Sequence, residues 1–337
     1  MICYLRFGIY DLRFGICDLL PILVLIYNLC MFLHPIIKCK NMPYPGELSA
    51  LITAILWSFT SLFFSEASQR IGSLNVNINR LLMASIFLLI TIFAAGYSFY
   101  LSSGQYFNLI LSGIIGLVFG DTYLFKAFQH IGARLSMLIM SLAPAITAVL
   151  AYFFLGETLA VWGILGMVIT LAGIAIVVFE RNEHPTSKYK ISRIGILYGF
   201  FGALGQGVGL IFAKLAFNEG AIDSFVATFI RIFASVILML PLAALTRKYK
   251  NPFTTYRNDT KALYLTTAGS ISGPYLGITF SLLAITYTKV GIAATIMATV
   301  PIVMLPILRY IYKEKLTWKS IAGAFVTVAG VAILFLR

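Results

Sequence analysis

The sequence is poor in charged residues. Asp, Glu, Lys and Arg make up only 11% of its 337 residues, whereas 60% are hydrophobic and the mean hydropathy is +0.93. A soluble domain needs roughly 25% charged residues to cover its surface. The composition therefore excludes an ordinary soluble protein and predicts an integral membrane protein.

Cysteine is absent beyond residue 39, and the three histidines are scattered without the spacing of metal ligands. The sequence has no phosphate-binding glycine loop and no nucleophile motif. We therefore predict no enzyme activity, no cofactor and no metal site, and any transport would use an ion gradient or the substrate's own gradient. The formal charge of +13 falls mostly in short loops, where it indicates topology signals and contacts with membrane lipids rather than nucleic-acid binding.

Long apolar stretches recur from Glu47 onward, separated by short polar breaks. A bilayer-spanning helix needs about 20 mostly apolar residues, whereas barrel strands alternate over about ten. The pattern predicts an all-α protein with ten transmembrane helices, at about 48–68, 76–97, 107–128, 134–155, 159–179, 194–217, 222–245, 262–287, 290–312 and 317–336.

The two halves of the chain are related by a constant offset of 157 residues. The offset pairs Gly116 with Gly273, Gly120 with Gly277, Pro144 with Pro301, and Glu157 with Glu314. We interpret this as a duplication, with repeats at 47–180 and 193–337. Because five helices is an odd number, the second copy must enter the membrane inverted, and inverted repeats are typical of secondary transporters with a midplane substrate site.

The sequences GETL and KEKL, the mid-helix proline and the glycine-containing closing helix together resemble the EamA-type family of the drug/metabolite transporter superfamily. The resemblance covers residues 47–337. It implies a multi-pass protein of the cell membrane that exports small metabolites, such as amino acids or related compounds, by alternating access. Import or facilitated diffusion is an alternative within transport, and a receptor or lipid-interaction scaffold is an alternative outside it. Whether the chain is a monomer or a homodimer stays open.

Asp121 is the first candidate for the site, because ionisable groups at membrane depth are costly and mark function. The duplicated fold does not require an acid there, since Ile278 holds the equivalent position. Asp121 could couple transport to protons or bind a substrate amine. The alternative is a structural ion pair with Lys126 or Lys214.

Other polar and aromatic residues in the spans are further candidates. Lys214 could bind a substrate carboxylate, pair with Asp121, or extend to the membrane surface, and Gln206 lies two turns earlier on about the same face. Aromatic and hydroxyl side chains could line a substrate cavity or simply pack against neighbouring helices, and these are Trp57, Ser58, Thr60 and Tyr123.

A second group of residues is predicted to be structural. Arg80 and Arg231 occupy equivalent positions, and both copies keep the arginine. Pro144 and Pro301 are expected to kink their helices. Small residues four apart allow helices to approach closely, and we expect this of Gly116, Gly120, Gly273 and Gly277.

The first 41 residues differ from the rest of the chain. LRFGIYD at 5–11 is repeated as LRFGICD at 12–18, and all four cysteines lie before residue 42. We predict that translation starts at Met42. The alternative is an extra helix within 16–37. This alternative would reconcile the family's cytoplasmic termini with the loop charges, which place the termini of the ten-helix core outside.

Overall fold

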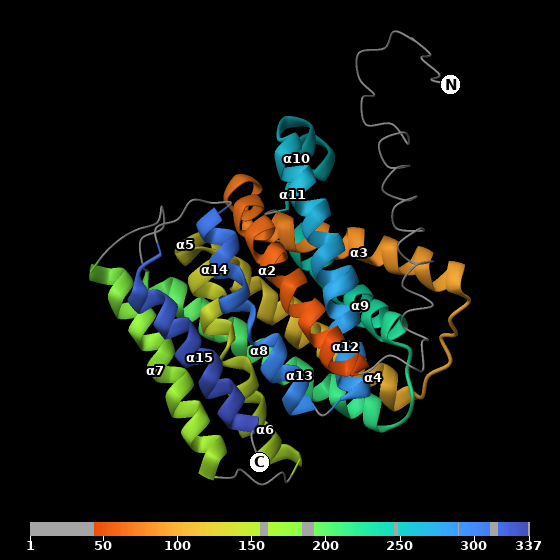
Figure 1. The fold of residues 1–337 in the computed structure, drawn as a ribbon. Helices are drawn as coiled ribbons and strands as arrows, with labels where there is room; N and C mark the ends of the chain where they lie inside the picture. Colours follow the sequence, from red (N-terminus) through yellow and green to blue (C-terminus); the bar gives the residue numbers. More distant parts are fainter. Residues whose placement is uncertain are drawn as a thin grey trace, which may run out of the picture.

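The computed structural model describes residues 44–155, 161–183, 192–245, 249–288, 290–310 and 316–335. Within these ranges every regular element is a helix (Figure 1). The predictions made for residues 1–41, Glu157 and Glu314 lie outside the described residues.

The helices fall into two successive groups along the chain. The first group comprises α2 (Pro45–Ile71), α3 (Ser73–Ala95), α4 (Ser103–Gly113), η1 (Ile114–Gly120), α5 (Asp121–Met140), α6 (Ala143–Leu155) and α7 (Val161–Glu183). The second comprises α8 (Arg193–Asn218), α9 (Ser224–Leu245), α10 (Pro252–Asn258), α11 (Thr260–Ser270), η2 (Ile271–Gly277), α12 (Ile278–Tyr287), α13 (Val290–Met297), α14 (Val300–Tyr310) and α15 (Trp318–Phe335).

Six helical segments of the described residues are long and apolar enough to cross a membrane. They are Pro45–Ile71, Ser73–Ala95, Ser103–Met140, Arg193–Asn218, Ser224–Leu245 and Thr260–Tyr287. Shorter apolar helices accompany them at Val161–Val177, Val300–Tyr310 and Trp318–Ile333. The chain is therefore a multi-pass, all-helical membrane protein.

A seven-residue π-helix interrupts each half of the chain at the same place. These are η1 and η2, whose first residues, Ile114 and Ile271, are separated by the 157-residue offset of the sequence repeat. Each π-helix lies between two α-helical segments of one long helix, α4 and α5 in the first half and α11 and α12 in the second. Short π-helical turns are found frequently at functional sites.

Two helices that the sequence predicts as continuous are broken. The predicted helix 134–155 stops at Met140 and resumes at Ala143, and 290–312 stops at Met297 and resumes at Val300. The helix before each break ends four residues before a proline, Pro144 or Pro301. A proline ring clashes with the carbonyl four residues earlier and provides no N–H, which favours a break at these positions.

A further bend occurs inside α5, at Gly132. Its backbone has φ 76° and ψ 170°, which is far from helical. A side chain disfavours positive φ, whereas glycine adopts it readily. The bend turns the chain from the third predicted span into the fourth.

Helices α7 and α15 lie side by side along one edge of the molecule (Figure 1). Their contact is reciprocal: Gly173 faces Thr327, and Gly330 faces Thr170. The Thr170 hydroxyl donates to the Gly166 carbonyl at 2.9 Å, and Thr327 donates to Gly323 at 2.8 Å. Equivalent residues of the two halves therefore meet each other across this interface.

Other helices cross between the halves in a similarly reciprocal way. Helix α8 packs against η1 and α5, whereas α2 packs against η2, α11 and α12. Glycines make these crossings close. Gly120 lies against Gly205 of α8, and Gly277 lies against Trp57 of α2.

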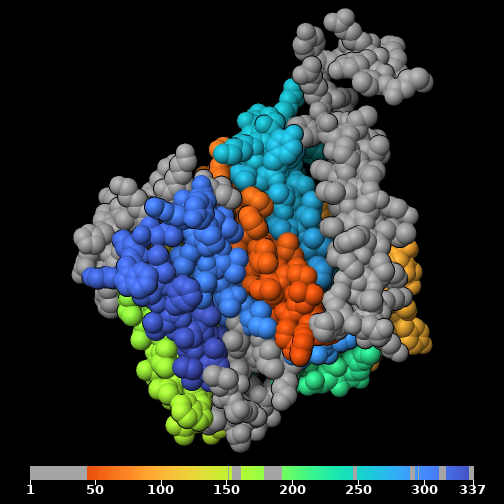
Figure 2. Space-filling view, in the orientation of Figure 1, coloured from red at the N-terminus to blue at the C-terminus, as the bar shows by residue number. Residues whose placement is uncertain are grey.

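Large apolar side chains are exposed on the surface of the described helices. Figure 2 shows the surface of α2 between the α14–α15 pair and helices α11 and α12. Leu48, Leu51 and Ile55 of α2 and Trp162 of α7 are among the exposed residues. Apolar side chains on a membrane-spanning helix are stable when lipid tails surround them.

A polar network ties the segment before α11 to the start of α3. Asn79 donates to the Tyr256 hydroxyl at 2.9 Å and accepts from the Tyr249 hydroxyl at 2.6 Å. The Lys250 amide donates to the Asn75 side chain at 2.9 Å. Burial raises the pKa of Tyr249 to about 12, so this tyrosine stays protonated as a donor at neutral pH.

Asp259 caps the first turn of α11, and replacing it tests the cap. Its carboxylate accepts from the Ala262 amide at 2.9 Å and lies 3.1 Å from Arg70. We expect Asp259→Ala to lower the free energy of unfolding by about 0.5–2 kcal/mol, whereas Asp259→Asn keeps a capping oxygen. Thermal unfolding of both variants in detergent measures the difference, and equal midpoints would contradict the capping role.

The same cap predicts a pH dependence. Hydrogen bonding from the Ala262 amide and the nearby Arg70 hold the pKa of Asp259 below its ordinary value. A depressed pKa in the folded state gives stability that is present above the unfolded pKa and is lost as pH falls through the folded pKa. The gap in stability between the native protein and Asp259→Ala should therefore shrink in acid.

Candidate functional site

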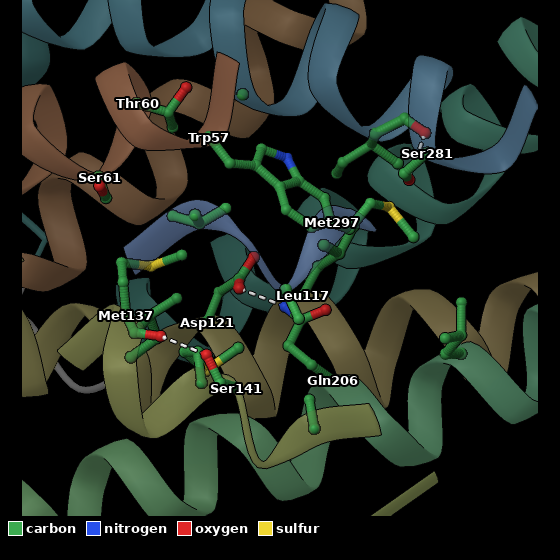
Figure 3. Close-up of a pocket in the computed structure, with 18 of the residues that line it drawn as sticks. Trp57, Thr60, Ser61, Leu117, Asp121, Met137, Ser141, Gln206, Ser281 and Met297 are labelled. Carbon is green, nitrogen blue, oxygen red and sulfur yellow. Dashed lines mark hydrogen bonds between the residues drawn. The ribbon is translucent and has the colours of Figure 1, made fainter. Parts of the chain in front are cut away.

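A cavity of about 190 Å³ lies in the centre of the described helices (Figure 3). Its first-half walls come from α2, α3, η1, α5 and α6, and its second-half walls come from α8, α9, η2, α12, α13 and α14. Both halves of the chain therefore share one central site. Pro144 and Pro301, which follow the two helix breaks, are both among the lining residues.

The lining is mostly apolar, with few ionisable side chains. Among the described residues that line the cavity, these are Arg80, Asp121 and Arg231, which are 5%, 4% and 5% exposed. Two positive charges and one negative charge leave the cavity with a net charge of +1. In the part of the chain that is described, no three His, Cys, Asp or Glu side chains lie together as metal ligands would.

Asp121 is held by two partners from different helices. Arg80 of α3 forms an ion pair with its Oδ2, and Gln206 of α8 donates to its Oδ1 at 2.5 Å (Figure 3). Arg80 also donates from Nε to Asn77 at 2.9 Å and lies 4.7 Å from the centre of the Phe125 ring. The cation that pairs with Asp121 is thus Arg80, not Lys126 or Lys214 as weighed from the sequence.

Arg231 of α9 lies in a different environment. Its Nε atom is buried and has no hydrogen-bond partner among the described residues. It is close enough to Asp121 for an electrostatic interaction, but Asp121 is bonded to Arg80 and Gln206. A Cβ at Gly116 would lie 3.6 Å from Arg231 Nη2, so the guanidinium rests against the glycine surface of η1.

Trp57 and Gln206 are the other sequence candidates that line the cavity. Figure 3 shows the indole of Trp57 on α2, across the cavity from Asp121 and Gln206. Ser58, the next residue, is buried and donates to the Ala54 carbonyl of its own helix at 2.7 Å. The Trp57 ring and the Gln206 amide thus line the cavity, whereas the Ser58 hydroxyl bonds to the backbone of its own helix.

The remaining candidates lie elsewhere. Lys126 Nζ is 5.1 Å from the centre of the Tyr123 ring and 5.4 Å from that of Tyr198, which makes a separate cation–aromatic cluster. Lys214 lies on α8, eight residues beyond Gln206. Among the described residues that line the cavity, Tyr123, Lys126 and Lys214 do not occur.

Sequence reasoning missed the position of the two arginines and of several polar residues. Arg80 and Arg231 were predicted to be structural, and the structure places both at the cavity. The hydroxyl side chains of Ser61, Ser141, Thr147 and Ser281 also line it, together with Thr60, which the sequence had suggested. A signal was present for Arg80, because a buried guanidinium needs partners and α3 carries Asn77 one turn earlier.

The chain matches the model of the EamA-like transporter family twice, at residues 44–179 and 193–336. These matches cover most of the sequence, so the chain belongs to the EamA-like transporter family. It is accordingly a membrane transporter with multiple apolar helices.

Several individual proteins are similar to it. Human solute carrier family 35 member G1 is 23% identical over 86% of this chain and 79% of its own length. An uncharacterised transporter of Archaeoglobus fulgidus is 18% identical over 86% of this chain and 97% of its own length. One from Clostridium kluyveri is 32% identical, but the match spans only 37% of this chain and 39% of that protein. A solved crystal structure matches 87% of the chain with a TM-score of 0.62 at 17% identity, which shows the fold alone.

Proposed function

We propose that the protein is a secondary active transporter that exports small metabolites across the cell membrane by alternating access. The observation that carries the proposal is the central cavity, which both halves of the chain line and in which three charged side chains are buried. Charged groups at membrane depth are costly and mark substrate or ion pathways. Amino acids and related compounds carry a carboxylate, which the net positive charge of the lining favours.

The proposed architecture is ten spans in two inverted repeats. Each repeat would contain one helix with a π-helical segment and one helix broken before a proline, as seen at Pro144 and Pro301. The reciprocal contacts of α7 with α15 support a two-fold relation, since such symmetry makes residue i contact residue j and j contact i. The repeats are proposed at 47–180 and 193–337.

Alternating access would move the two halves against each other around the cavity. The breaks at Met140 and Met297 leave short helical segments beside the site, which can reorient without unfolding a whole span. Asp121 is the proposed coupling group, because it links Arg80 of α3 to Gln206 of α8. A proton is the proposed coupling ion, and the apolar exterior is proposed to contact membrane lipids.

Flux from liposomes tests the proposal. The full-length protein would be reconstituted with a mixture of amino acids and small organic acids, with and without a pH gradient. Saturable efflux of a subset of these solutes, accelerated by the gradient, is the expected result. Equal efflux from protein-free liposomes, with protein that elutes as a single folded species, would overturn transport.

A pair of tryptophan variants ties the flux to the cavity. Trp57 lines the cavity, whereas Trp162 is exposed on the outer face of α7. We expect Trp57→Ala to lower efflux at least about tenfold, because burying a large apolar side chain contributes about 1.5–3 kcal/mol. Trp162→Ala should keep efflux within about twofold, since surface changes are usually nearly neutral. Equal effects at the two positions would place the pathway elsewhere.

A further inference from the structure

The two arginines of the cavity occupy equivalent positions in the sequence repeat but have different surroundings. Arg80 and Arg231 match in the alignment of NRLLMAS with IRIFAS, at an offset of 151 residues. Arg80 has an acid, an amide and two aromatic rings as partners. If both arginines were needed only for folding, the second copy should provide comparable partners.

The second copy has lost the polar partners. Asp121, the counter-ion of Arg80, corresponds to Ile278 at the 157-residue offset. Asn77, which accepts from Arg80 Nε, corresponds to Thr228 at the 151-residue offset. The Thr228 hydroxyl donates instead to the Ser224 carbonyl of its own helix at 2.7 Å. Arg231 Nε consequently has no partner among the described residues.

One aromatic partner is also missing in the second copy. Phe125, 4.7 Å from Arg80, corresponds to Leu282 at the 157-residue offset. The second copy therefore has no equivalent of the acid, the amide or this ring that stabilise Arg80. A buried charge is expensive unless it is paired and hydrogen-bonded. Since Arg231 lines the cavity, a ligand in the cavity can provide what the protein does not.

We propose that Arg231 binds the negative group of the transported substrate, which is therefore a small organic monoanion, most simply a carboxylate with an apolar body. This inference rests on the proposed transport function and names its substrate class. The net charge of +1 in the lining matches one negative charge. A planar guanidinium binds a carboxylate through two parallel hydrogen bonds. Arg231 Nε, which has no partner among the described residues, can donate one of them.

The volume and composition of the cavity limit the size and polarity of the substrate apart from its carboxylate. A cavity of roughly 150 Å³ lined by apolar side chains holds one benzene ring, and this one is about 190 Å³. Leu117, Met137 and Met297 form part of its apolar wall (Figure 3). A molecule with one ring or a short branched chain and a single carboxylate fits this space.

Benzoate and benzamide are a matched pair of probes, since they share a ring and differ in charge. We expect benzoate to raise the thermal midpoint of the full-length protein in detergent, and benzamide to leave it unchanged at the same concentration. Phenylacetate and 4-methylpentanoate, with their amides, extend the comparison. A shift with the amides or with matched amines, but with none of the carboxylates, would overturn the proposal, as would no shift with any probe.

Variants assign the effect to Arg231. Arg231→Gln should weaken benzoate binding at least about tenfold, because a charge-assisted hydrogen bond is lost, and Arg231→Lys should retain part of it. Ile278→Asp provides a second route if Arg231 variants do not fold. This variant places an acid in the second half at the position equivalent to Asp121. The new carboxylate would pair with Arg231 in place of benzoate, so Ile278→Asp should bind benzoate about tenfold more weakly than Ile278→Asn. Equal binding by the two Ile278 variants would contradict the role of Arg231.

The flux experiment separates this inference from the proposed function. Carboxylate binding that depends on Arg231, without any flux, would leave the anion site standing and overturn transport. Flux confined to neutral or cationic solutes would support transport and overturn the anion site.

Discussion

Replacing Asp121 with asparagine should remove most of the transport activity and destabilise the protein. Asp121 is the only acid among the described residues that line the cavity, and it joins Arg80 to Gln206. Breaking a buried ion pair by removing one partner costs about 3–5 kcal/mol, because the other charge stays buried and unpaired. Arg80 would keep its bond to Asn77 and its contact with Phe125, which places the expected loss at the lower end of that range.

The thermal midpoint and the flux of Asp121→Asn would be measured on the same preparation. Asp259→Asn is the matched control, since Asp259 also pairs with an arginine, Arg70, but at the exposed end of α11. Exposed pairs contribute little, so this variant should resemble the native protein. A double replacement, Asp121→Asn with Arg80→Gln, should recover part of the stability and none of the transport. Native stability in Asp121→Asn alone would show that the pair does not hold α3 to α5.

Adding one methyl group at Gly205 should disrupt the contact between the halves of the chain. A Cβ at this position would lie 2.5 Å from the Gly120 Cα atom and 3.0 Å from the Ile115 carbonyl oxygen. Both neighbours are backbone, so α8 would have to move away from η1 and α5. Overpacking of this kind typically costs about 1–3 kcal/mol, and more where the neighbours cannot shift.

Gly116→Ala is the matched control for Gly205→Ala. Gly116 belongs to the same crossing, but a Cβ there would meet nothing closer than Arg231 Nη2 at 3.6 Å. Alanine favours helix over glycine by about 0.5–1 kcal/mol, so Gly116→Ala should be neutral or slightly stabilising. The comparison uses the thermal midpoint in detergent. Similar midpoints for the two variants would mean that α8 packs less closely against η1 and α5 than these distances indicate.

Much of the fold could be predicted from the sequence, because the signals are local. Runs of apolar residues predicted most of the helical segments. The two π-helices were not predicted, although they begin at positions related by the 157-residue offset. The breaks at Met140 and Met297 were not predicted as interruptions, although the prolines that cause them were expected to kink their helices. A proline indicates where a helix is weakened, whereas the surrounding packing decides whether it bends or stops.

The site could be predicted only in part. Asp121, Gln206 and Trp57 line the cavity, whereas Tyr123, Lys126 and Lys214 are not among the described residues that do. All six looked alike in the sequence, as polar or aromatic residues within apolar spans. Which of them face inward depends on how each helix is rotated about its axis, and that rotation is set by neighbours from other parts of the chain.

The sequence alone indicated a multi-pass membrane transporter. Low charge, long apolar runs and the internal repeat can be recognised without knowing any tertiary contact. It also marked Asp121 as unusual, because a carboxylate within an apolar span is costly wherever it points. The tertiary structure decided that Arg80 pairs with Asp121, whereas Arg231 Nε has no hydrogen-bond partner among the described residues. The physical reason is that ion pairs join residues distant in the chain, so their assignment follows from helix packing rather than from composition.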